Sequence, residues 1–401
     1  MIRQFSWVAI GRIVAAMVQM VTLALVAVWL GPADFGVLAA VLALAVVPQT
    51  LLDLGIPTYV LKARAAREDP EMLQFALRVN GATSALLSAV SAAALLLLGT
   101  FISPLLLMML PLAVWVGAER NVEVWMGVAL ADGDAQLNVT FLVGRRLFGL
   151  ALMLVTFLIG VPPVLSFAIA LASSSLIAVI FAQALLRPRV RVRPRGHRSI
   201  AGLVHLTAPF WVHSAATQVR NLDTALVALI ADPTQAGYYA VASRLTGPLR
   251  ILPTSLAAVL LPRISKANGR IDRSLGLTVI ATLFAMTMIY ISIAIAAPWA
   301  VATFLGAAYL PSIVPIQIVC VGLVLGAAAS LLAAILQAKG RQRFVASASV
   351  AASLVCLVAI VIGTYLAGAA GAAVGLVSSF AVQVCLMGGL LIVKRIRGDE
   401  R

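Results

Sequence analysis

Residues 187–198 read RPRVRVRPRGHR, a strongly basic stretch near the middle of a 401-residue chain. Its prolines and like charges oppose a packed element, so we expect a solvated linker that contacts lipid headgroups. Around it the chain is mostly apolar, with 62% hydrophobic and only 11% charged residues. A soluble protein carries about 45–50% apolar residues, and a larger excess cannot be buried in one soluble core. The sequence therefore predicts a membrane protein, with lipid as its solvent.

The apolar runs on either side of the linker have the length of membrane-spanning helices, which need about 20 residues. Unbroken runs favour helices over barrel strands, whose side chains alternate between lipid and lumen. Six runs precede the linker and six follow it. The expected segments are 5–30, 36–61, 75–98, 104–130, 139–160, 164–186, 203–230, 236–262, 275–297, 311–337, 344–366 and 370–393.

The loops between these segments differ in charge. Alternate loops carry the lysines and arginines, whereas no basic residue occurs in the remaining loops, which lie around Asp34, Pro104, Pro162, Asp232, Tyr309 and Ala369. Basic loops stay in the cytoplasm, so we expect a bacterial inner-membrane protein with both termini cytoplasmic. The net charge of +15 then reflects topology and contact with anionic membrane lipids, and nucleic acid is not an expected partner.

A short motif occurs in both halves of the chain. Gly-Pro-Ala-Asp-Phe-Gly at 31–36 matches Asp-Pro-Thr-Gln-Ala-Gly at 232–237, with Pro and the final Gly both displaced by 201 residues. The match predicts a duplication, with helix bundles at 1–186 and 201–401 joined by the linker 187–200. Two copies of six helices have the same orientation, so we expect a pseudo-two-fold axis along the membrane normal and a site between the bundles.

Several phrases also resemble a known family: WLGPADFG at 29–36, LDLG at 52–55, FLGAAY at 304–309, QAKG at 337–340 and GAAGAA at 368–373. They are similar to the polysaccharide-type flippases of the multidrug/oligosaccharidyl-lipid/polysaccharide exporter superfamily. The resemblance covers nearly the whole chain. It implies an all-α protein of about twelve helices around a V-shaped, alternately open cavity. It also implies outward movement of polyprenyl-diphosphate-linked oligosaccharides of the O-antigen, exopolysaccharide or capsule type, with polysaccharide polymerase and glycosyltransferase machinery as partners.

Charged side chains at membrane depth are candidates for function, because each costs about 2.5–3.5 kcal/mol at a helix centre. A diphosphate cannot enter hydrocarbon unpaired, and guanidinium matches phosphate oxygens best. Polar stripes at helical spacing should face a wet cavity. We therefore predict substrate contacts at Arg12, Gln19, His213, Arg220, Arg244 and Arg250. Two alternatives stay open: Arg244 snorkels to the outer surface, and His213 makes a helix contact or titrates with pH.

A second set of charged residues suits ion pairing or ion coupling: Asp53, Glu119, Arg120, Glu123 and Asp223. Spacing predicts the intrahelical pairs Arg120 with Glu123 and Arg220 with Asp223. Asp53 is a partner for Arg12, a gate or a proton site. Arg145 and Arg146 lie near the inner edge, where we expect them to snorkel.

No motif supplies chemistry. The sequence has no phosphate-binding glycine-rich loop followed by Lys and Ser or Thr, no nucleophile–base pair and no cluster of metal ligands. We therefore expect a transporter rather than an enzyme, without cofactor or metal. Coupling to protons, to sodium or to the membrane potential stays open. The alternatives are a small-molecule or multidrug exporter of the same superfamily, or a membrane polysaccharide polymerase or ligase, which would normally carry a large outer loop.

Overall fold

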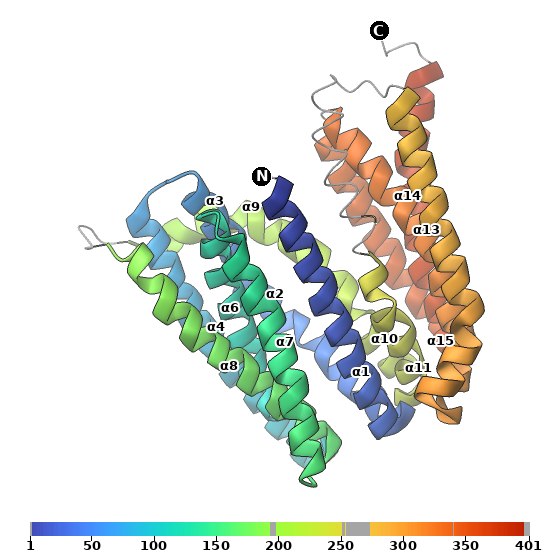
Figure 1. The fold of residues 1–401 in the computed structure, drawn as a ribbon, viewed down its shortest axis with the longest axis horizontal. Coiled ribbons are helices and arrows are strands. Elements are labelled where there is room, and N and C mark those ends of the chain that lie inside the picture. The colour runs from blue at the N-terminus through green and yellow to red at the C-terminus, as the bar shows by residue number, and fades with distance from the viewer. Residues whose placement is uncertain (1, 193–197, 251–252, 254–272, 340, 397–401) are drawn as a thin grey trace. The chain divides into compact units, whose positions relative to one another are not determined.

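The computed structural model describes residues 2–192, 198–250, 253, 273–339 and 341–396 (Figure 1). Every regular element in these ranges is helical. The first half contains α1 (Ile2–Leu44), α2 (Val46–Asp53), α3 (Ile56–Ala65), α4 (Pro70–Phe101), α5 (Leu105–Met108), α6 (Pro111–Ala131), α7 (Ala135–Leu158) and α8 (Pro163–Val190). The second half contains α9 (Ile200–Gln218), η1 (Val219–Leu222), α10 (Asp223–Ile230), α11 (Pro233–Leu245), η2 (Gly247–Arg250), α13 (Arg273–Ala300), η3 (Val301–Leu305), η4 (Ala307–Ser312), α14 (Ile313–Ala338) and α15 (Gln342–Ile396).

Packing divides these helices into two compact units that are not contiguous in sequence. Unit 1 comprises Met1–Thr22 and Leu44–Val219, and unit 2 comprises Leu23–Ala43 and Arg220–Arg401. Helix α9 falls in unit 1 because it packs on α2, α3 and α4. The predicted division into copies 1–186 and 201–401, with the linker 187–200, is based on a sequence repeat, whereas these units are defined by packing. The predicted division therefore stays a prediction.

Seven helical stretches in the described residues are long and apolar enough to cross a membrane: 10–53, 70–101, 135–158, 163–190, 279–305, 307–337 and 342–390. The first and last of these are long because each contains a backbone break, at Gly31 (φ 73°) in α1 and at Ala367–Gly368 in α15. Each therefore holds two of the predicted segments. Helix α6 carries Glu119, Arg120 and Glu123, which makes it too charged to qualify. The prediction of an all-α chain with about twelve helical segments is confirmed, with 251–252 and 254–262 of the eighth segment outside the described residues.

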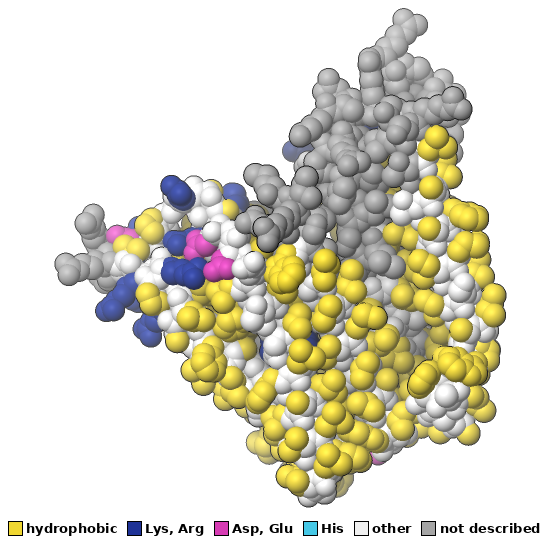
Figure 2. Space-filling model, in the orientation of Figure 1, with side chains coloured by type: hydrophobic (Ala, Val, Ile, Leu, Met, Phe, Trp, Pro, Cys, Tyr) yellow, Lys and Arg dark blue, Asp and Glu magenta, His cyan; other side chains and the backbone are white. Residues whose placement is uncertain are grey.

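The surface of the helices is apolar. Large hydrophobic side chains such as Phe101, Leu158 and Tyr365 are more than four-fifths exposed. On the face shown in Figure 2, hydrophobic side chains cover most of the described surface, and most of the visible lysines and arginines gather in one region, beside acidic groups. A soluble monomer rarely exposes such large continuous apolar patches. The distribution is that of a protein whose helices face lipid.

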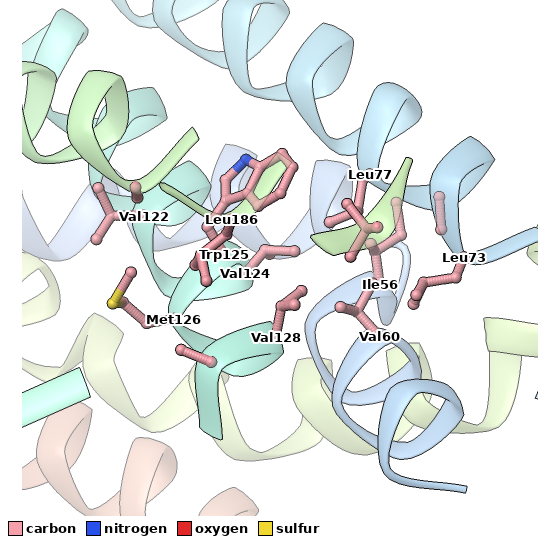
Figure 3. Close-up of a cluster of buried hydrophobic side chains, with 14 of the residues drawn as sticks. Ile56, Val60, Leu73, Leu77, Val122, Val124, Trp125, Met126, Val128 and Leu186 are labelled. Atoms are coloured by element: carbon pink, nitrogen blue, oxygen red, sulfur yellow. The ribbon is translucent and has the colours of Figure 1, made fainter. Parts of the chain in front are cut away.

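The core of unit 1 lies where α3, α4, α6 and α8 meet. Its buried side chains include Ile56, Val60, Leu77, Val128 and Leu186, which interlock around Trp125 (Figure 3). Each helix contributes one apolar face, and burial of a large side chain of this kind is worth about 1.5–3 kcal/mol when water is the reference. This core fixes the helices that carry the charged residues of unit 1.

A backbone break separates α2 from α3. Leu54 and Gly55 have φ values of 50° and 67°, in the left-handed region. Gly55 lies so close to the backbone of α9 that a Cβ would come within 2.5 Å of the Thr207 carbonyl oxygen. Close by, the indole of Trp211 donates to the carbonyl of Thr50 at 2.7 Å. The break is therefore held by α9, whose Trp211 supplies a hydrogen-bond donor to a carbonyl near the end of α2.

Candidate functional site

Unit 2 gathers three predicted arginines. Arg220 lies in η1, where the α-helix tightens between α9 and α10. Arg244 lies in the last turn of α11, and Arg250 ends η2. All three side chains are only partly exposed. The short helices η1 and η2 interrupt the seventh and eighth predicted segments, so two of the arginines lie at breaks rather than on continuous helix.

These three arginines and Asp223 form the cationic cluster of unit 2. Asp223, at the start of α10, supplies its carboxylate. It accepts hydrogen bonds from the hydroxyl of Tyr239 at 2.8 Å and from the amide and hydroxyl of Thr224 at 2.6 and 3.1 Å. Tyr239 is completely buried. Asp223 also interacts electrostatically with Arg244 and Arg250. Neutral donors therefore hold this carboxylate in place.

The predicted pair of Arg220 with Asp223 is not formed. Arg220 donates instead to the hydroxyl of Ser379 on α15, at 3.2 Å. The two residues are three apart in sequence, but η1 has tighter geometry than the α-helix for which the pairing rule holds. Arg220 is thus directed at α15 rather than along its own helix.

One aromatic ring contacts two of the arginines. The guanidinium carbons of Arg220 and Arg250 each lie 5.5 Å from the centroid of the Phe380 ring. Arg244 differs, since its Nη2 donates to the carbonyl of Ala39 in α1 at 3.1 Å. The cluster thus holds three guanidinium groups and one carboxylate, an excess of positive charge that is stable at membrane depth only beside water or an anion.

The remaining predicted contacts lie in unit 1. Arg12 and Gln19 are on the first part of α1, where Arg12 is exposed and Gln19 is half-buried. His213 is on α9, and its side chain lies outside the described residues. The structure thus brings Arg220, Arg244 and Arg250 together with Asp223. Contact of Arg12, Gln19 and His213 with substrate stays a prediction.

Unit 1 has its own buried charges, centred on Glu119 of α6. Its carboxylate pairs with Arg145 at 2.5 Å and with Arg146 at 3.3 Å, and it accepts from the hydroxyl of Ser175 at 2.8 Å. The predicted snorkelling of Arg145 and Arg146 is wrong, because α7 turns both side chains toward α6. The side chain of Arg145 is only 8% exposed.

The other predicted pairs of unit 1 are also not formed. Arg120 donates to the hydroxyl of Thr83 on α4 at 3.1 Å, while Glu123 is exposed. Asp53 interacts electrostatically with Arg120 and accepts hydrogen bonds from Ser214 and the Gly55 amide, so Arg120 takes the place predicted for Arg12. Partners in this unit come from neighbouring helices, which spacing along one helix cannot reveal.

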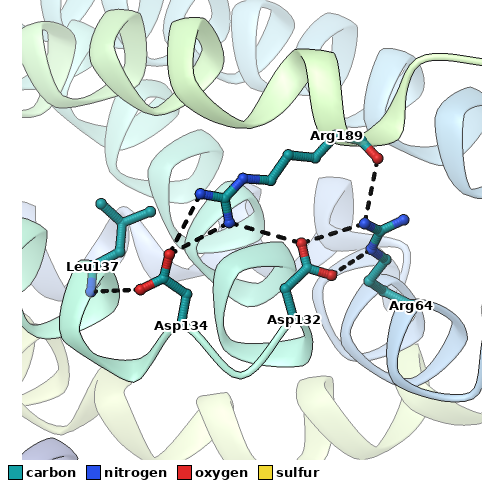
Figure 4. Close-up of polar contacts among 5 residues, drawn as sticks. All are labelled: Arg64, Asp132, Asp134, Leu137 and Arg189. Atoms are coloured by element: carbon teal, nitrogen blue, oxygen red, sulfur yellow. Dashed lines mark hydrogen bonds and ion pairs between the residues drawn. The ribbon is translucent and has the colours of Figure 1, made fainter.

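A further set of ion pairs lies at the end of unit 1 that carries the basic loops (Figure 4). Arg64 binds Asp132 at 2.7 Å, and Arg189 reaches both Asp132 and Asp134, at 3.9 and 3.4 Å. Arg198 contacts Asp69 at 2.8 Å. The expectation that the basic stretch is only a solvated linker is therefore wrong at these positions. Helix α8 continues through Pro188 to Val190, and acidic groups of unit 1 pair with Arg189 in its last turn.

Within the described ranges, no three His, Cys, Asp or Glu side chains gather as metal ligands would. The acidic side chains are instead spread among arginine and hydroxyl partners. That the protein uses no metal or cofactor stays a prediction.

Helices that expose apolar side chains and carry buried and partly buried arginines define a multi-pass membrane protein. The same fold occurs in an inward-facing multidrug resistance MATE family transporter of the MOP superfamily, with a TM-score of 0.69 and 13% identity over 98% of this chain and 100% of that one. It also occurs in the lipid II flippase MurJ in an inward closed conformation, with a TM-score of 0.71 and 13% identity over 98% of this chain and 88% of that one. It also occurs in a MOP superfamily transporter from Pyrococcus furiosus, with a TM-score of 0.64 and 14% identity over 98% of this chain and 95% of that one.

The family of this chain is identified from its sequence. Residues 25–314 match the family described as polysaccharide biosynthesis protein, and the chain belongs to this family. No curated protein matches the chain. The resemblance noted in the short motifs around 29–36 and 304–309 is therefore confirmed.

Proposed function

We propose that the protein is a flippase that moves polyprenyl-diphosphate-linked oligosaccharide units from the cytoplasmic to the periplasmic leaflet of a bacterial inner membrane. The units are of the O-antigen, exopolysaccharide or capsule type, and both chain termini are cytoplasmic. Family membership supports a role in polysaccharide production. The MOP-type fold, shared with a protein described as a lipid II flippase, supports transport of a lipid-linked substrate.

The cationic cluster of unit 2 is the observation that carries the proposal. Its three arginines outnumber its one carboxylate, which is already engaged by Tyr239 and Thr224. A diphosphate must keep its charge compensated when it leaves water, and guanidinium groups can do so with paired hydrogen bonds. A cationic drug would be repelled by the same arrangement. The cluster therefore favours an anionic substrate over the cations expected of a multidrug exporter.

The membrane potential is a sufficient energy source for this proposal. An anion that leaves a negative interior gains about 2.3 kcal/mol per charge per 100 mV. A substrate with two negative charges gains roughly twice that amount. Return of the empty cationic site can be coupled to protons or sodium, for which the acidic residues Asp53 and Glu123 of unit 1 are candidates. Polysaccharide polymerase and glycosyltransferases are the proposed partners.

Deletion of the gene tests the function directly. Lipid-linked oligosaccharide and surface polysaccharide are quantified in the same cells, with and without the restored gene. We expect repeat units to accumulate on the polyprenyl carrier while surface polymer disappears, and restoration of both by the gene. Normal levels of both pools would refute the flippase, and export of cationic drugs would then be the next assay.

A further inference from the structure

Phe380 connects two arginines that come from different parts of unit 2. Arg220 lies in η1 and Arg250 in η2, yet each guanidinium carbon is 5.5 Å from the same ring centroid. The two carbons therefore cannot lie farther apart than twice that distance. Sequence gives no hint of this arrangement, because Phe380 follows Arg220 by 160 residues.

Two guanidinium groups at this separation repel each other, and Arg250 does interact electrostatically with Arg220. The face of an aromatic ring carries partial negative charge and attracts a cation within about 6 Å of its centroid. Phe380 therefore offsets part of the repulsion between Arg220 and Arg250. A neutral ring does so without forming an ion pair that a substrate would have to break.

The Phe380 ring is itself buried. Phe380 is 7% exposed, and a Cβ built on Gly326 of α14 would lie 3.6 Å from its ring atoms. Its neighbour Ser379 is completely buried, accepts from Arg220 and donates to the carbonyl of Leu376 at 2.7 Å. Phe380 and Ser379 thus form a buried surface on α15 that contacts the arginine side chains.

A ring fixes the position of a guanidinium without satisfying its demand for hydrogen-bond acceptors. Guanidinium carries five N–H donors in a planar fork and has no acceptor. Arg220 donates to Ser379 through Nη2, and the contact with Phe380 supplies no oxygen acceptor. Oxygen atoms of an anion are partners that suit the donors of a guanidinium held in this way.

We propose that Phe380 is a positioning residue that holds Arg220 and Arg250 as a matched pair, and that this pair makes the protein select a diphosphate over a monophosphate. This inference rests on the proposed function. Two adjacent phosphoryl groups present enough oxygens and charge for two guanidinium groups at once. A single phosphoryl group has fewer oxygens over a shorter span, so it reaches two separated guanidinium groups less well than a diphosphate does.

The test uses purified full-length protein and two probes, farnesyl diphosphate and farnesyl monophosphate, with binding measured by titration. The wild type binds the diphosphate more tightly. Arg220→Ala and Arg250→Ala each weaken diphosphate binding. Phe380→Leu removes the ring but keeps an apolar side chain. It weakens diphosphate binding roughly fivefold to thirtyfold, the range expected for loss of one or two cation–π contacts, and it reduces the preference over the monophosphate.

Phe380→Tyr keeps the ring face and retains the affinity and preference of the wild type. Phe284→Leu, at an exposed phenylalanine of α13 in the same unit, is the matched control and changes neither. Thermal unfolding shows that each variant is folded. Equal loss in the Leu and Tyr variants would mean that the ring only fills space and would overturn the inference.

Two further outcomes separate this inference from the proposed function. If Phe380→Leu keeps the affinity and preference of the wild type while the two arginine variants lose binding, the positioning role of Phe380 is rejected. The cationic site would then still stand. Unchanged binding in both arginine variants, or no preference for diphosphate in the wild type, would reject the cationic site itself.

Discussion

Gly36 and Gly237 make reciprocal contacts with each other's motif inside unit 2. A Cβ on Gly36 would overlap the carbonyl of Pro233, and a Cβ on Gly237 would overlap the carbonyl of Pro32. The two glycines are 201 residues apart, and so are the two prolines. Contacts in which each partner exchanges roles are the mark of a two-fold relation. The repeated motif therefore packs on its own copy, about a local pseudo-two-fold axis.

Alanine at either glycine should destabilise this contact. Gly36→Ala and Gly237→Ala each place a methyl group where the backbone of the other motif lies, and overpacking of this kind costs about 1–3 kcal/mol. We expect a lower unfolding midpoint in detergent and less protein in the membrane. Gly144→Ala, on α7 with nothing within 4 Å of the added atom, is the control. If Gly36→Ala and Gly237→Ala are both as stable as the wild type, the close contact between the two motifs does not contribute to stability.

Replacement of Glu119 should be far more damaging than its single charge suggests. Glu119→Gln keeps the shape but leaves the buried Arg145 and the partly buried Arg146 without their carboxylate. Loss of one partner from a buried ion pair costs about 3–5 kcal/mol. Thermal unfolding of the purified protein measures the effect.

Glu123→Gln is the comparison for Glu119, because it lies one turn away on α6 and interacts with the same two arginines electrostatically but forms no ion pair with them. We expect a small change in stability for this variant. If both variants unfold like the wild type, the arginines of α7 must find other compensation, and the buried pair would not be structural.

The ion pairs around Asp132 should contribute much less. The side chains of Arg64 and Arg189 are 27% and 40% exposed, and exposed pairs are worth about 0–1 kcal/mol each. With two such pairs, Asp132→Asn should therefore lower the unfolding free energy by about 2 kcal/mol at most, and less at high salt because screening weakens the pairs. Chemical unfolding at two salt concentrations checks this. A loss as large as that of Glu119→Gln would mean that the cluster is effectively buried.

The positions of the helices could be predicted from the sequence because hydrophobic length and loop charge are local properties. Each predicted segment from 5–30 to 370–393 is mostly helical where the structure describes it. The break at Leu54–Gly55 was not predicted. Its cause is a contact with α9, about 150 residues away, which no local pattern reveals.

The candidate site shows the same limit. The arginines could be identified because charge is conspicuous in an apolar segment. Their partners could not: Ser379 and Phe380 lie in a distant segment, and Glu119 pairs across helices with Arg145 rather than within α6. Spacing along one helix predicts only neighbours on that helix, whereas these contacts depend on how helices pack.

Arg12 and Arg250 provide the functional prediction. Arg12 is exposed on an apolar segment of unit 1, and Arg250 lies over Phe380 in unit 2. An exposed cation at membrane depth is stable in a wet cavity and not in lipid. Arg12→Ala and Arg250→Ala should each abolish restoration of surface polysaccharide in the deletion strain while membrane abundance stays unchanged. Arg343→Ala, at an exposed position in the first turn of α15, should restore it fully. Full restoration by the first two variants would remove the argument for a cationic substrate path, and loss of abundance would assign these arginines a structural role instead.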